Sequence, residues 1–228
     1  MAVSVNSDTY PYDRIQSGFT RLRGTEEIPI KILKYLMDLP LPGYTPIDDN
    51  DRARVRLMKY LWYDGARPLA NPLPTPTEKL SMLFDGDNPV LNTQEEKKRH
   101  PKGYRIYPQR VWGQSDTEAD TTLKLYLGRT IAKDNFHTVL GLQFEILVNV
   151  NMENTTRTDA YSRAYNLEQC IIEALHGVNI TGIGVIDFDR YAHADNGSKS
   201  GFDYGNHVLR LPHMSVEWCD SEMDMPSN

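Results

Sequence analysis

The sequence predicts an α+β protein with a mixed, mainly antiparallel sheet packed by helices and an extended irregular N-terminal region. Apolar residues alternate with polar ones over residues 142–150, which is the period of a strand with one buried face. Apolar residues also recur every three or four positions over residues 160–175, which is the period of a helix with one buried face. Frequent prolines over residues 65–101 indicate irregular structure before this core.

We divide the 228 residues into four parts. Residues 1–24 are polar and turn-rich, so they cannot bury enough apolar surface to fold alone and are expected to form an N-terminal arm. Residues 25–101 are a helical and proline-rich irregular region, and residues 102–219 are the α+β core. Residues 220–228 form a C-terminal tail. A neighbouring subunit is the expected partner of the arm and the tail.

Three helices are expected before the core. The first covers residues 25–39, where two glutamates in the first turn complement the helix dipole. The second covers residues 51–63, with its arginines mostly outside the apolar stripe. A short third helix covers residues 77–84 and is capped by its own first threonine. The charged run of residues 95–100 is expected to be an exposed turn.

Five strands are expected in the core. They cover residues 104–112, 123–127, 142–150, 180–191 and 208–218. Pro108 confines the first to a sheet edge or a bulge, because proline donates no hydrogen bond to the ladder. Gly128 is expected to end the second, and Gly182 with Gly184 to bend the fourth. The apolar pattern changes phase at Pro212, which predicts a bulge in the last strand.

The core helix is expected to begin near Thr158 or Asp159, after a polar break over residues 153–156. It ends at His176, because Gly177 tolerates the left-handed conformation of a C-terminal cap. Its buried stripe is Ala160, Ala164, Leu167, Ile171, Ala174 and Leu175. Its charged residues, which include Arg163 and Glu168, are expected on the outside.

Composition excludes several classes of function. Acidic residues outnumber Lys and Arg by 31 to 25, which disfavours a protein whose main role is to bind phosphates or an anionic membrane. The sequence has no apolar run of about 18 residues, so no transmembrane helix is expected. Residues 1–12 lack the features of a signal peptide. The cysteines, Cys170 and Cys219, are expected to be reduced thiols.

Carboxylates near the end of the fourth strand are the one candidate for metal chemistry. Asp187 and Asp189 project on one strand face, and Asp195 or Asp203 could join them around a divalent cation. An acidic exposed face is the favoured interpretation. The two glycines before them lack the third glycine and the helix of a phosphate loop. We therefore predict no catalytic residue, no metal and no cofactor.

Four segments match a known family in order along the chain. They are Phe144–Val150, Tyr161–Leu175, Gly184–Phe188 and His207–Leu211. With this pattern the sequence resembles the tail-terminator or tail-completion (neck) proteins of long-tailed bacteriophages. The strands expected before residue 128 would complete that family's mixed sheet, so the resemblance covers roughly the last 125 residues.

The resemblance implies a structural virion protein of the phage neck or tail, without enzymatic activity. Such a protein forms a ring, expected to be a hexamer, that caps the tail tube and joins it to the head. The implied partners are identical subunits, the tail tube protein and head-completion or collar proteins, with DNA only passing through the lumen and no membrane. The implied location is the virion, after assembly in the host cytoplasm. Two alternatives are another tail or collar component and a metal-dependent enzyme that uses Asp187 and Asp189.

The expected contacts with other subunits or with the tube lie on the N-terminal arm and around the long polar loop 192–205. They are Tyr10, Tyr12, Arg14, Arg21, Arg190, Asp195, Lys199, Phe202 and Tyr204.

Overall fold

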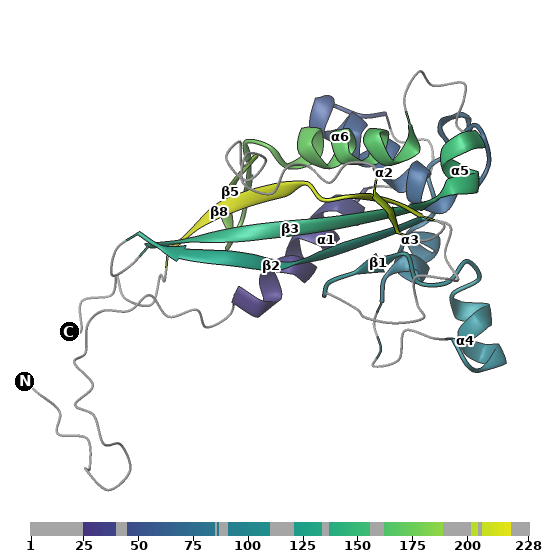
Figure 1. The fold of residues 1–228 in the computed structure, drawn as a ribbon, viewed down its shortest axis with the longest axis horizontal. Coiled ribbons are helices and arrows are strands. Elements are labelled where there is room, and N and C mark those ends of the chain that lie inside the picture. Colours follow the sequence, from purple (N-terminus) through teal and green to yellow (C-terminus); the bar gives the residue numbers. More distant parts are fainter. Residues whose placement is uncertain are drawn as a thin grey trace, which may run out of the picture.

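The computed structural model confirms the α+β fold class, with helices packed against a mixed, mostly antiparallel sheet (Figure 1). The residues that it describes are 25–39, 45–84, 86, 91–109, 121–133, 137–155, 162–188, 202–204 and 207–219. The described α-helices are α1 (Ile28–Met37), α2 (Asp49–Trp62), α3 (Pro76–Met82), α4 (Gln94–Arg99), α5 (Val150–Thr155) and α6 (Arg163–Leu175). Short 3-10 helices cover Thr25–Glu27 and Pro68–Ala70.

The short helices begin where capping boxes place them. Thr75, rather than the predicted Thr77, caps α3, because its side chain accepts from the Glu78 backbone while the Glu78 carboxylate accepts from the Thr75 backbone. Thr93 and Glu96 form the same box at the start of α4. The prediction of an exposed turn over residues 95–100 is therefore wrong.

Helix α6 begins later than predicted, because Ser162 has an extended backbone and its hydroxyl accepts from the Tyr165 backbone at 3.1 Å. The Glu153 carboxylate of α5 adds a second acceptor, for the backbone N–H of Ala164 at 3.0 Å. The predicted polar break therefore contains a helix. The predicted start and Ala160 lie outside the described residues. At the other end, Gly177 has the expected left-handed conformation, with φ of 75°.

The strands form a sheet of order β1-β2-β3-β8-β5-β4, with β7 pairing with β3 and β6 with β7. They are β1 (Ile106–Tyr107), β2 (Thr121–Ala132), β3 (His137–Asn149), β4 (Val178–Ile180), β5 (Gly184–Phe188), β6 (Phe202–Tyr204), β7 (His207–Arg210) and β8 (His213–Cys219). Only β1 pairs in parallel, with β2, and every other pair is antiparallel. The short β1 lies at the edge, as predicted for a segment containing Pro108.

Strand β2 does not end at Gly128. Its pairing with β3 shifts register between Leu127 and Thr130 and then continues to Ala132. A side chain at Gly141 of β3 would lie 2.7 Å from the Arg129 carbonyl oxygen, so only glycine fits opposite this irregularity. The β2–β3 hairpin is therefore longer than the sequence pattern indicated.

The fourth predicted strand is two strands. Strands β4 and β5 form a tight antiparallel hairpin, with Gly182 in its turn at φ of 75° and Gly184 directly after the turn, as the first residue of β5, at φ of 114°. The two glycines therefore allow a turn between two strands instead of a bend in one continuous strand, because a β-carbon atom disfavours these backbone angles.

The bulge predicted at Pro212 is absent. Ile146 pairs with Arg210, Gln143 pairs with His213, and the two strands advance by the same number of residues between these pairs. The apolar residues instead change face along one regular register. Leu209 lies on the opposite face of the sheet from Met214.

The core lies between one face of the sheet and helices α1, α2 and α6. In Figure 1, α2 and α6 lie side by side along this face. Predicted core residues from β3 and α6 are fully buried there: Phe144, Ile146, Val148, Ile171 and Leu175. Residues of α1 and α2, such as Ile32 and Leu57, belong to the same cluster. On the other face, a smaller cluster of Phe84, Leu91, Tyr104 and Tyr107 covers the β1 end.

Replacing Leu175 by Ala should destabilise the protein by about 2 to 5 kcal/mol, because its buried side chain would leave a cavity in the main core. Urea titration of the folded chain measures this change. Leu80→Ala is the control: Leu80 is 64% exposed, and its removal should change stability by less than about 0.5 kcal/mol. Equal losses in the two variants would show that α6 does not pack as described.

Candidate functional site

Most of the predicted contact residues lie outside the described part of the chain. These are Tyr10, Tyr12, Arg14, Arg21, Arg190, Asp195 and Lys199. Phe202 and Tyr204 belong to strand β6, where their backbones pair with Leu209 and His207, so this part of the predicted loop is a strand. The proposed contact surface therefore remains a prediction.

The candidate metal residue Asp187 has a side chain that is 65% exposed, and its Oδ1 lies 3.8 Å from Nδ1 of His176. His176 Nδ1 accepts a hydrogen bond from the Phe188 backbone at 3.1 Å. Asp189 lies outside the described residues. Within the part of the chain that the structure describes, no three His, Cys, Asp or Glu side chains gather closely enough to hold a metal ion.

Cys170 is completely buried on α6. Burial raises the pKa of its thiol to about 12. The thiol is therefore protonated at neutral pH, and a protonated, inaccessible thiol is a poor nucleophile. In the described ranges, no helix is both long and apolar enough to cross a membrane.

The densest polar network in the described structure lies at the C-terminal end of α2. The last carbonyls of a helix have no partner within the helix and carry partial negative charge. Here three cationic side chains supply the partners. Arg163 of α6, which is fully buried, donates to the carbonyls of Tyr60 and Tyr63. Arg105 donates to Leu61 at 2.7 Å, and Lys102 donates to Trp62 at 2.8 Å.

Asp64 supplies a carboxylate to this network. One of its oxygens accepts from Arg105 at 2.6 Å and the other from Lys102 at 3.3 Å. Burial acts to raise the pKa of Asp64, but the hydrogen bond and charge of Arg105, together with Lys102, outweigh burial and lower it. The network thus binds α2, α6 and the segment before β1 together.

A similar arrangement ends α1. Arg54 of α2 donates to the carbonyls of Tyr35 and Asp38, and Lys79 of α3 donates to the carbonyl of Leu39 at 2.5 Å. Only 3% of Lys79 is exposed, and this burial, with the nearby charge of Arg54, lowers its pKa against the opposing effect of Asp38. Lys79 is therefore positioned as an interior cap for α1.

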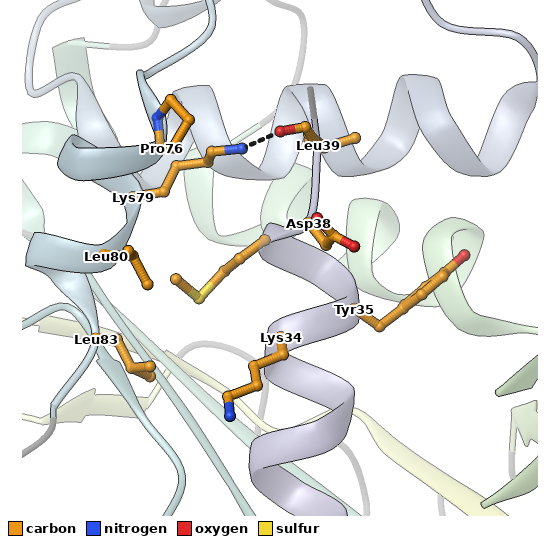
Figure 2. Close-up of a pocket in the computed structure, with 9 residues that line it drawn as sticks. Lys34, Tyr35, Asp38, Leu39, Pro76, Lys79, Leu80 and Leu83 are labelled. Carbon is orange, nitrogen blue, oxygen red and sulfur yellow. Dashed lines mark hydrogen bonds between the residues drawn. The ribbon is translucent and has the colours of Figure 1, made fainter. Parts of the chain in front are cut away.

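Beside Lys79 lies a pocket of about 480 Å³ between the end of α1 and α3 (Figure 2). Its lining residues are Lys34, Tyr35, Met37, Asp38, Leu39, Pro76, Lys79, Leu80 and Leu83. Figure 2 shows Leu80 and Leu83 of the α3 segment facing α1 across it. A mostly apolar lining with few charged groups suits an apolar side chain better than a polar metabolite.

The apolar periodicity of the sequence did not predict that charged residues of these networks are buried. Arg163 and Glu168 were expected on the outside of α6, but they are 0% and 5% exposed. Glu168 instead accepts from Arg210 of β7 at 2.8 Å. Arg54 is also buried. The sequence feature that could have indicated the burial of Arg163 is its position directly before Ala164 of the buried stripe.

Replacing Asp64 by Asn should destabilise the protein at neutral pH. Because folding lowers the pKa of Asp64, its contribution is fully present above the unfolded value of about 3.8 and is lost as pH falls through the folded value. Urea midpoints of both proteins, measured from pH 7 down to about pH 2, should converge at the acid end. Asp187→Asn, at a mostly exposed carboxylate, is the control. If the difference in urea midpoint between the wild type and Asp64→Asn did not change with pH, the role assigned to the Asp64 carboxylate would be contradicted.

A search of curated proteins found no match, and a search of solved structures also found none. The family model YomW matches residues 55–206, from within α2 to just beyond β6. This match covers more than half of the 228 residues. The chain therefore belongs to the YomW family, a phage-derived family of the SPbeta prophage of Bacillus.

Proposed function

We propose that this chain is a structural protein of the phage neck or tail, whose identical subunits form a ring that caps the tail tube and joins it to the head. The observation that carries the proposal is membership of a phage-derived family over residues 55–206. Its partners are further copies of itself, in a hexamer, the tail tube protein, and head-completion or collar proteins. It has no enzymatic role.

Two features of the molecule support this proposal. The mixed, mainly antiparallel sheet packed by helices agrees with the fold implied by the resemblance to tail-completion proteins. The net charge of −6 suits a ring through which DNA only passes, because repulsion of phosphates prevents adhesion to the lumen. The ring requires a heterologous contact, in which one surface of a subunit docks on a different surface of the next.

Removing residues 1–20 should weaken assembly and leave the folded body intact. The expected result is a melting temperature within a few degrees of the full chain, because the described core begins at Thr25. Native mass spectrometry should show a loss of oligomers. A large fall in the melting temperature of the monomer would contradict the prediction.

Negative-stain images of the full chain mixed with purified tail tubes test the function itself. A cap at one end of the tube is the expected result, and binding elsewhere would support another tail or collar component instead. A chain that stays strictly monomeric and leaves tubes bare would overturn the proposal.

A further inference from the structure

The outer edge of β2 is the longest strand edge without a partner in the described structure. Along β2, strand β1 pairs only with Leu123 and Lys124, and no described strand pairs with the outer edge of Leu127–Ala132. After the register shift, Thr130–Ala132 is regular again and pairs with β3 on its inner side. The edge contains no proline, and Arg129, Thr130 and Ile131 are exposed. Open backbone donors and acceptors on such an edge are a template for another strand.

The opposite edge of the sheet is β4. Its residues, Val178–Ile180, pair only with β5 in the described structure. They include neither proline nor a charged side chain, the usual devices that keep an edge from pairing. Strand β4 is as long as the regular segment Thr130–Ala132 at the other edge.

An exposed apolar residue also lies on one face of the sheet near each edge: Ile131 on β2 itself, and Val185 on β5, which is next to the edge strand β4. Ile131 is 48% exposed and pairs with Val139, whose neighbour Leu140 faces the helices. Val185, 46% exposed, lies beside Ile186, which also faces the helices. Because neighbouring residues on a strand alternate in face, Ile131 and Val185 both lie on the face away from the helices.

We infer that β4 of one copy pairs with the Thr130–Ala132 edge of β2 in the next copy, so that the sheet continues from subunit to subunit. On the open face this places Ile131 beside Asn179 of the next copy, with Val185 following in the same row. Two different surfaces meet, so the contact is heterologous and repeats around a ring. The inference rests on the proposed function, because it names the surfaces by which that ring would close.

Cysteine cross-linking tests this pairing. In a Cys219→Ser background, Ile131→Cys and Asn179→Cys are prepared in the full chain, while the buried Cys170 stays unreactive. A short bismaleimide should cross-link a mixture of the two variants and neither variant alone. A chain that carries both substitutions should give a ladder of covalent oligomers. Ala66→Cys mixed with Asn179→Cys is the control and should give no product, because Ala66 is exposed elsewhere and does not line the pocket.

A second variant tests the same edge without cross-linking. Ile131→Lys should reduce oligomers at least tenfold in native mass spectrometry with an unchanged melting temperature, because lysine on an edge opposes strand addition. Ala66→Lys, at an exposed position away from the edge and the pocket, should assemble normally. Oligomers that persist in Ile131→Lys and give no cross-link would overturn the edge pairing and leave the ring proposal standing. A full chain that never assembles and never binds tubes would overturn both.

Discussion

The fold depends on buried cations that cap the C-terminal ends of its helices. Three cationic side chains, the buried Arg163 and Arg105 and the partly exposed Lys102, converge on the last carbonyls of α2. A buried arginine is costly unless its N–H groups find acceptors, and a helix end is costly unless its carbonyls find donors. Joining the two lets one set of hydrogen bonds reduce both costs. Because the donors come from distant positions in the sequence, the same bonds fix α2 against α6 and the sheet.

These caps explain why the N-terminal helices are part of the body of the protein. Residues of α1 and α2 share one hydrophobic cluster with β2, β3 and α6. Hydrophobic packing alone is not directional and would allow helices to slide along the sheet. The contacts of Arg54 with the end of α1, and of Arg163 with the end of α2, restrict each helix to one position. The substitution at Asp64 examines the weaker, solvent-facing side of this network.

The sequence predicted what depends on local pattern and missed what depends on distant partners. The alternation along β3 and the stripe on α6 were sufficient to identify both, because each follows from burial of one face. Helix α4 was missed because it buries no residue of its own and is defined by a capping box. The buried Arg163 was missed because its partners lie about a hundred positions away. The pocket beside α3 likewise arises only when α1 and α3, far apart in sequence, are packed together.

The shape of the sheet then separates a rigid part from a part that is available for contacts. In Figure 1 the turn end of the β2–β3 hairpin reaches beyond the helices. What holds this end is pairing with β8, the buried Leu140, and an exposed ion pair between Lys133 and Glu217. An exposed ion pair contributes at most about 1 kcal/mol, so backbone pairing must supply most of the local stability. A strand added to the outer edge of β2 would extend that pairing, and assembly would then stabilise the turn end of the hairpin.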